Sequence, residues 1–282
     1  PVLPERETGD QPLWVALRSG HTEVAHLLLD AGHPLDSKVL VTAALHGQPS
    51  IVRRALEAGI DPDSKVIFEE SDDDRCGLGS DRNLGENESD KELEEPVNYR
   101  TPLIAVAEIN AEIKGSAPGF VEVVDDEFDG SCQEMDSSQW QKRVVQSQLE
   151  IIRMLLDAGA DPNGQDDGGR TPLNALADLS NHVLVRFESG SLDPDDDTHV
   201  SLSGELDPVP AMELLLEAGA DINTKDHLGR TTLHRLMDKT LSWHRDPLPI
   251  IGFLLEAGAE VDPQDNEGQT PLMLAMRARS LE

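Results

Sequence analysis

Acidic residues supply the first candidates for chemistry in this sequence. The run Asp193-Pro194-Asp195-Asp196-Asp197 has the carboxylate spacing with which a calcium loop of the EF-hand type begins. Such a loop also needs a Gly at position 6, where the chain turns sharply, and a bidentate Glu at position 12. Counted from Asp193, these positions hold Thr198 and Gly204. The run therefore does not predict a metal site.

The cysteines and histidines give no stronger candidates. Cys76 and Cys132 lie in separate acidic stretches without a CxxC pattern, so we expect neither a zinc site nor a disulfide framework. His182 and His199 lie among carboxylates, but the sequence places no base beside a Ser, Cys or Thr nucleophile. We therefore predict no catalytic residue, no metal and no cofactor. Free thiols are typical of a reducing compartment, which here means the cytoplasm or the nucleus.

The elements that would position any site follow from a phrase that occurs five times. Each copy has apolar residues followed by an acidic residue, Ala and Gly. The copies end at Gly32, Gly59, Gly159, Gly219 and Gly258. A Gly after a run of helix-forming residues suits the left-handed conformation that commonly ends a helix. The phrase therefore predicts five helix ends.

A second phrase precedes the helices. It reads Gly-Arg-Thr-Pro-Leu at residues 169–173, with close copies at 229–233 and 268–272 and weaker copies at 100–103 and 11–13. Thr is a good N-cap and Pro is tolerated at the first helical position, so this phrase predicts the start of a helix A. The order is then a turn, helix A, helix B and a glycine stop. This order resembles the ankyrin repeat, which has a period of about 33 residues and the signature T-P-L-H-x-A.

The resemblance implies an all-α repeat solenoid in which each repeat has a helix-turn-helix and a short β-hairpin. It covers nearly all of residues 1–282, which we treat as a single ankyrin-repeat domain with long acidic loop insertions. The expected repeats are residues 11–36, 37–63, 99–163, 167–223 and 226–262, with a partial repeat at 265–282. The expected insertions are residues 64–98, 111–142, 181–207 and 239–247. Three of the four come from the turn between helices A and B, so we expect one strongly negative edge.

The net charge of −32 is concentrated in the insertions. Residues 69–95, 122–136 and 188–207 carry −23 of it. These stretches are either solvated loops that add solubility or elements that attract a basic protein, such as a histone, a ribosomal protein or a basic tail. Phosphate repulsion argues against direct binding of nucleic acid.

The sequence also bears on the membrane and on the extent of the protein. An apolar run of 18 residues and a secretory signal pattern are both missing from the sequence, so we expect no membrane contact. The chain opens on Pro1 and closes just after a predicted helix A. We therefore expect a piece of a longer protein; otherwise the chain is expected to be a monomer.

The resemblance implies structural roles for the signature histidine and for two arginines. His234 stands at the histidine of T-P-L-H, which implies a buried hydrogen bond to backbone between repeats. The other repeats have Trp14, Ile104, Asn174 and Met273 at this position. We expect these replacements to weaken the polar ties between repeats. Arg170 and Arg230 are expected to pair with Asp167 and Asp226, respectively.

The family resemblance implies a protein-binding scaffold whose concave face is formed by helix A surfaces and hairpin tips. The residues expected on this face are Arg18, Asp166, Asp167, Asn174, Asp178, Lys225, His227, Arg235 and Asp238. Trp243 and Arg245, in a short insertion, are further candidates because Trp and Arg dominate binding hot spots. Two hypotheses remain open. The chain is a non-enzymatic interaction scaffold with a basic protein partner, or a regulatory or targeting domain of a larger enzyme or channel.

Overall fold

The computed structural model of the 282-residue chain describes residues 12–18, 20–67, 99–108, 137–178, 183–188, 199–204, 207–238 and 248–279. At residues 18, 137–141, 183–188, 199–204 and 278–279 it describes the backbone alone.

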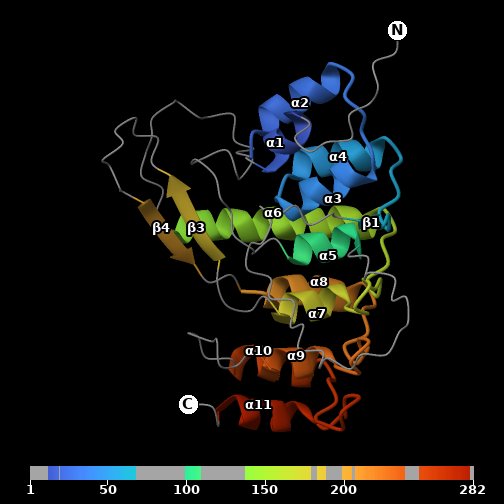
Figure 1. The fold of residues 1–282 in the computed structure, drawn as a ribbon, viewed down its shortest axis with the longest axis vertical. Helices are drawn as coiled ribbons and strands as arrows, with labels where there is room; N and C mark the ends of the chain where they lie inside the picture. Colours follow the sequence, from blue (N-terminus) through green and yellow to red (C-terminus); the bar gives the residue numbers. More distant parts are fainter. Residues whose placement is uncertain are drawn as a thin grey trace, which may run out of the picture.

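The described helices form five antiparallel pairs and a last single helix, stacked along the long axis of the molecule (Figure 1). The pairs are α1 (Pro12–Arg18) with α2 (Thr22–Asp30), α3 (Ser37–Leu45) with α4 (Pro49–Glu57), α5 (Pro102–Ala107) with α6 (Ser137–Asp157), α7 (Pro172–Asp178) with α8 (Val209–Glu217), and α9 (Thr232–Asp238) with α10 (Leu248–Glu256). The last helix is α11 (Pro271–Arg279). This arrangement confirms the predicted all-α repeat solenoid.

Local signals in the sequence explain where the helices begin and end. Thr101 accepts a hydrogen bond from the backbone N–H of Ile104 at the start of α5, and Pro102 follows it at the first helical position. At the other end, the five glycines of the recurring phrase have φ between 83° and 97°. The chain leaves each helix B in the left-handed conformation, which Gly adopts without a steric cost. The predicted helix starts and stops are therefore explained by capping.

The core is built repeat against repeat from Leu, Ile, Val and Ala. Every residue of α5 is buried between its neighbours, and Leu40, Ile151, Leu173 and Met212 are fully buried in other repeats. One pair of such short helices cannot bury enough apolar surface alone. The core therefore forms where neighbouring repeats stack, and each repeat contacts only its neighbours.

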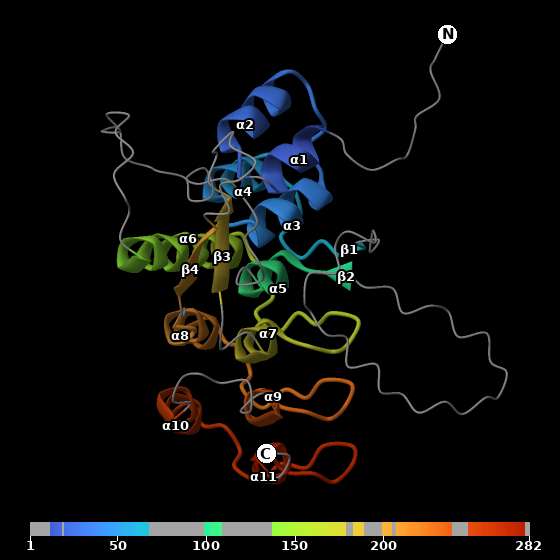
Figure 2. The same cartoon turned by 60° about the vertical axis from the view of Figure 1, so that its left-hand side comes forward.

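Two small antiparallel sheets lie in or beside the expected insertions. Strand β1 (Val66–Ile67) pairs with β2 (Tyr99–Arg100), so the chain leaves and re-enters the stack on neighbouring strands. Strand β3 (Val183–Glu188) pairs with β4 (His199–Gly204), and this second hairpin lies beside α6 (Figures 1 and 2).

The β3–β4 hairpin corrects the expectation that residues 181–207 are a loop. Val183, Val185 and Phe187 recur with period two in β3, although Leu184 is apolar as well, and β4 alternates strictly. The register sets Val185 opposite Leu202 and Phe187 opposite Val200. Alternation with period two favours a strand, even where the flanking composition is acidic.

A row of side-chain amides ties the hairpin bases together. Asn163 Oδ1 accepts from the N–H of Asp221 at 2.7 Å, and Asn163 Nδ2 donates to the carbonyl of Gly219 at 3.1 Å. Asn223 makes the same two bonds with Glu260 and Gly258. Asp63 takes this position one repeat earlier and accepts from the N–H of Asp161 at 2.9 Å. A carboxylate cannot make the second bond, because it has no N–H to donate.

Replacing Asp63 with Asn is therefore expected to stabilise the stack by about 0.5–1.5 kcal/mol, the net value of one hydrogen bond. Urea unfolding of the two proteins would measure the difference. The reverse change, Asn163→Asp, is the matched control and is expected to lose a similar amount. A lower unfolding midpoint for Asp63→Asn would contradict this account of the row.

Candidate partner-binding face

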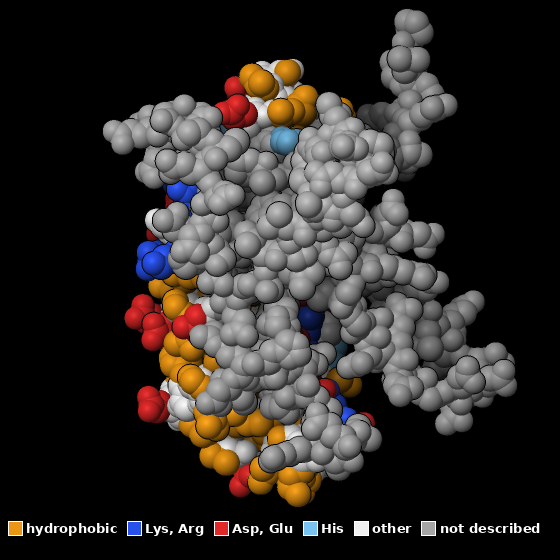
Figure 3. Space-filling model, turned by 90° about the vertical axis from the view of Figure 1, so that its left-hand side faces the viewer, with side chains coloured by type: hydrophobic (Ala, Val, Ile, Leu, Met, Phe, Trp, Pro, Cys, Tyr) orange, Lys and Arg blue, Asp and Glu red, His pale blue; other side chains and the backbone are white. Residues whose placement is uncertain are grey.

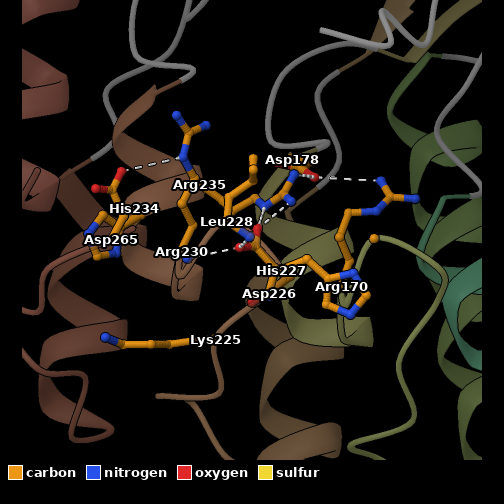
Figure 4. A network of polar contacts seen from close by, with 12 residues as sticks. Arg170, Asp178, Lys225, Asp226, His227, Leu228, Arg230, His234, Arg235 and Asp265 are labelled. Carbon is orange, nitrogen blue, oxygen red and sulfur yellow. Dashed lines mark hydrogen bonds and ion pairs between the residues drawn. The ribbon is translucent and has the colours of Figure 1, made fainter. Parts of the chain in front are cut away.

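Arginines and carboxylates alternate along the face formed by the A helices (Figure 4). In the described part of the chain, five arginines take part, and we call this set the arginine ladder. Its arginines are Arg100, Arg170, Arg230, Arg235 and Arg277. Its carboxylates are Glu108, Asp166, Asp178, Asp226, Asp238 and Asp265.

Arg170 is the central member of the ladder. Its Nε lies 2.7 Å from Asp166 of its own hairpin, and its Nη2 lies 3.0 Å from Glu108 of the preceding repeat. Arg100 Nε also forms an ion pair with Glu108, at 3.0 Å. Burial by itself would lower the pKa of Arg170, but the carboxylates of Glu108 and Asp166 raise it above its ordinary value. Arg170 is therefore a permanent charge that joins two repeats.

The ladder continues through the acids that end α7 and α9. Asp178 lies 3.0 Å from Arg235 of the next repeat, whose Nε also donates to Asp226 at 2.9 Å. Asp238 pairs with Arg230 of its own repeat at 3.1 Å and with Arg277 of the next at 3.8 Å. Each of these acids thus connects its own repeat to the one that follows.

The first carboxylate of each hairpin organises the turn. Oδ1 of Asp226 accepts from the N–H groups of Leu228 and Arg230, both at 2.8 Å. Asp166 and Asp265 accept in the same way from the residues two and four positions on. All three side chains are buried. The role was missed from the sequence, although the pattern Asp-x-x-Gly-x recurs there three times.

These contacts correct the two pairings that were expected for the arginines. Arg170 pairs with Asp166, not with the neighbouring Asp167. The side chain of Arg230 contacts Asp238, while Asp226 holds Arg235.

Two family models match parts of the chain. The model described as ankyrin repeats (many copies) matches residues 141–182, and the model described as ankyrin repeat matches residues 8–38. The chain contains ankyrin repeats, and its described helices form the stack expected of them.

The chain is similar to ankyrin-containing parts of much longer proteins. It is 25% identical over 272 residues to the E3 ubiquitin-protein ligase KEG of Arabidopsis thaliana, which covers 83% of this chain and 16% of the relative. It is 37% identical over 95 residues to the human neurogenic locus notch homolog protein 1, covering 31% of this chain and 4% of the relative. The chain thus spans only a small part of the relatives it matches.

Of the residues expected to contact a partner of this ankyrin stack, two are buried. Asp166 is 2% exposed and holds its own hairpin, and Asn174 is 0% exposed. Both act inside the stack, which corrects their assignment to the binding surface. The predicted contacts that are half-buried are Asp167, Asp178, Arg235 and Asp238, the last three within the arginine ladder.

The other predicted contacts divide between the hairpins and the undescribed parts of the chain. Lys225 and His227 are exposed on the hairpin that precedes α9. The side chain of Arg18 lies outside the described residues, as do Trp243 and Arg245.

The histidine of the ankyrin signature has the expected structural role. His234 is 0% exposed, and its Nε2 lies 3.1 Å from the carbonyl of Gln269 in the next repeat. Its Nδ1 accepts from the N–H of Thr231 at 3.1 Å. These partners assign the neutral tautomer with the proton on Nε2, because a carbonyl can only accept. Asn174, at the same position one repeat earlier, accepts from Thr232 Oγ1 at 2.7 Å. The expected weakening is therefore wrong at this repeat.

The buried imidazole predicts a pH dependence of stability. Burial lowers the pKa of His234 below its ordinary value of 6.5. The unfolded chain takes up a proton near that value, while the folded state does not until the pH is lower. Stability from this group is thus complete above about pH 6.5 and is lost as the pH falls, by at most about 1.4 kcal/mol per pH unit. Urea unfolding between pH 7.5 and 5 would measure it.

His234→Asn is the matched control, because Asn174 occupies the equivalent position. The difference in stability between the two proteins is expected to shrink as the pH falls. A difference that stays constant over this range would contradict the assignment of a neutral imidazole.

Two further observations concern the described segments only. They contain no group of three His, Cys, Asp or Glu residues placed to hold a metal ion. Among their helices, none combines the length and apolar character needed to cross a bilayer.

Proposed function

We propose that this chain is a non-enzymatic interaction scaffold whose partner is a basic protein in the cytoplasm or nucleus. Ankyrin repeats are interaction modules, so a protein partner follows from the family. The charge of the partner is inferred from one observation: the positive and negative charges within the arginine ladder nearly cancel. Five arginines there face six carboxylates. The ladder therefore carries about one of the 32 excess negative charges, and the rest lie elsewhere.

The exposed charge on the outer helices supports the same proposal. Acidic side chains lie at the height of α8 and α10, and Lys and Arg side chains at the height of α4 and α6 (Figure 3). The exposed acids there include Glu213, Glu217 and Glu256. The repeats that contain most of the ladder thus also present uncompensated negative charge, which speeds encounter with a basic partner.

An affinity capture tests this function. The intact protein would be compared with a version in which Asp and Glu of residues 69–95, 122–136 and 188–207 are changed to Asn and Gln. Proteins recovered from a eukaryotic extract at low and moderate salt would be identified by mass spectrometry. The recovered protein would then be purified and titrated by calorimetry.

Recovery of a basic protein by the intact form, with loss on neutralisation, would assign recognition to the insertions. Recovery by both forms at moderate salt would assign it to the stack. If the purified candidates are acidic or show no binding by calorimetry, the proposed basic partner is wrong.

A second candidate is a regulatory or targeting domain within a longer protein that carries its activity elsewhere. The small share of each relative that the chain covers, 16% for KEG and 4% for notch 1, favours it. The full reading frame would decide: an encoded catalytic or membrane domain supports this candidate. A frame that adds no further domain would exclude it.

A further inference from the structure

We infer that the hairpin tips before α7, α9 and α11 bind an extended peptide in which one apolar residue stands between two basic residues. We call these tips, residues 166–169, 226–229 and 265–268, the tip strip. The inference rests on the proposed function and names the kind of segment that the scaffold would bind. The three hairpins project on the same side of the stack (Figure 2).

The tip strip is held together by bonds between neighbouring hairpins. The N–H of His227 donates to the carbonyl of Gly168 at 3.0 Å, and the N–H of Asn266 donates to the carbonyl of Leu228 at 2.9 Å. The side chain of Asn266 also donates to the carbonyl of His227 at 2.8 Å. These bonds fix the strip before any ligand binds, so the strip loses little conformational entropy on binding.

Leu228 is the apolar member of the strip. Its side chain is 53% exposed, although its backbone is held on both sides by Asp226 and Asn266. A single exposed leucine is ordinary on a protein surface. Here the leucine stands on a fixed turn, and the equivalent positions of the two neighbouring tips are Gly168 and Glu267. Gly168 leaves room beside the leucine for an apolar side chain of a ligand.

Carboxylates lie on either side of Leu228. Asp167 is on the preceding tip and is half-buried, and Glu267 is on the following tip and is exposed. Burial raises the pKa of Asp167, and so does the neighbouring carboxylate of Asp166. Arg170 offsets part of this effect, but its guanidinium is also held by Glu108 and Asp166. A basic residue of the ligand beside Asp167 would offset more of it.

The spacing of the repeats fixes the pattern of the ligand. Packed helices lie about 8–10 Å apart, and so do the hairpins that they carry. An extended chain advances about 3.3 Å per residue, or three residues per repeat. Glu267 holds the position equivalent to Leu228, and Asp167 lies one residue before that position. A ligand with an apolar residue at position 4 would therefore place basic residues about three positions away on either side, at positions 1 and 7. The pattern reads the same in both chain directions.

Fluorescence anisotropy with purified protein tests the inference. The probe is a labelled peptide with Arg at positions 1 and 7, Leu at position 4 and Ala or Ser elsewhere. A second peptide with the Arg residues at positions 2 and 6 has the same charge and composition. We expect the first peptide to bind at least about tenfold more tightly, the factor that a single hot-spot contact provides.

Variants on the surface locate the site. Leu228→Ser is expected to weaken binding of the first peptide about tenfold, and Asp167→Asn with Glu267→Gln is expected to do the same at low salt. Leu255→Ser is the matched control, because Leu255 is also exposed, at 40%, but lies on α10. Circular dichroism would confirm that each variant is folded.

Equal binding of the two peptides, or unchanged binding by Leu228→Ser, would overturn the inference. So would binding that is lost only when the three acidic stretches are neutralised, because the peptide would then contact the insertions. No detectable binding at about 1 mM peptide would overturn it as well. The proposed function would still stand in each of these cases if a basic protein captured from extract binds by calorimetry.

Discussion

Replacing Arg170 with Met is expected to lower the free energy of unfolding by about 3–5 kcal/mol, the range for removing one partner of a buried ion pair. The guanidinium contacts Glu108 and Asp166, whose side chains are 2% and 1% exposed. Without it, Asp166 loses its ion-pair partner and keeps its two backbone N–H bonds, and among the described residues Glu108 keeps only Arg100 as a charged partner. Met retains the apolar length of the side chain, so the change tests the charge and not the packing.

Urea unfolding at pH 7 would measure the loss. Arg153→Met is the control, because Arg153 is exposed on α6 and its replacement is expected to change stability by less than about 0.5 kcal/mol. Arg170→Lys should fall between the two, since a lysine keeps the charge but cannot reach both carboxylates with a planar fork.

A double-mutant cycle with Glu108→Gln would show how the two repeats are coupled. The double variant should lose less than the sum of the single losses, because removing both charges leaves one fewer buried charge unpaired. Additive losses would contradict a direct interaction between the repeats through this pair.

The sequence predicts the helices well because their signals are local. A Thr residue precedes most A helices and a Gly follows each of the five B helices, and the apolar residues within the helices specify which side is buried. The β3–β4 hairpin was not predicted, because the period-two pattern is short, is interrupted by Leu184 and lies in an acidic segment.

The ladder could not be predicted in the same way, because its pairs join distant parts of the chain. Arg170 and Glu108 are 62 residues apart, and Arg235 and Asp178 are 57 apart. An insertion separates the members of each pair, so spacing in the sequence gives no indication of contact. Pairing depends on how one helix A stacks on the next.

The site residues show a related limit. Asp166 and Asp167 are neighbours of the same type, yet Asp166 is buried in its hairpin and Asp167 is only half-buried. Alignment of the three hairpins would have separated them, since Asp226 and Asp265 share the position of Asp166 but not that of Asp167. For repeat proteins, position within the repeat is thus more informative than residue type.

Gly229→Ala is expected to destabilise the stack by about 2–5 kcal/mol, from two separate costs. The first is backbone strain: Gly229 has φ of 76°, which costs other residues about 1–2 kcal/mol. The second is a collision. A Cβ atom at Gly229 would lie 2.8 Å from the backbone nitrogen of Asn266 and 2.5 Å from its Oδ1. The next hairpin would have to move, at a further cost of about 1–3 kcal/mol.

Gly268→Ala separates the two costs. Gly268 has nearly the same φ, 75°, but no described atom lies within 4 Å of a Cβ built there. Its replacement should therefore show the strain alone, about 1–2 kcal/mol. Urea unfolding of both variants gives the two losses, and hydrogen exchange at the Asn266 amide reports on its bond to Leu228. If the amide hydrogen of Asn266 exchanges faster in Gly229→Ala but not in Gly268→Ala, close approach of the hairpins holds the tip strip in place. Equal losses in the two variants would show instead that the strain is the whole effect, and that neighbouring hairpins adjust freely.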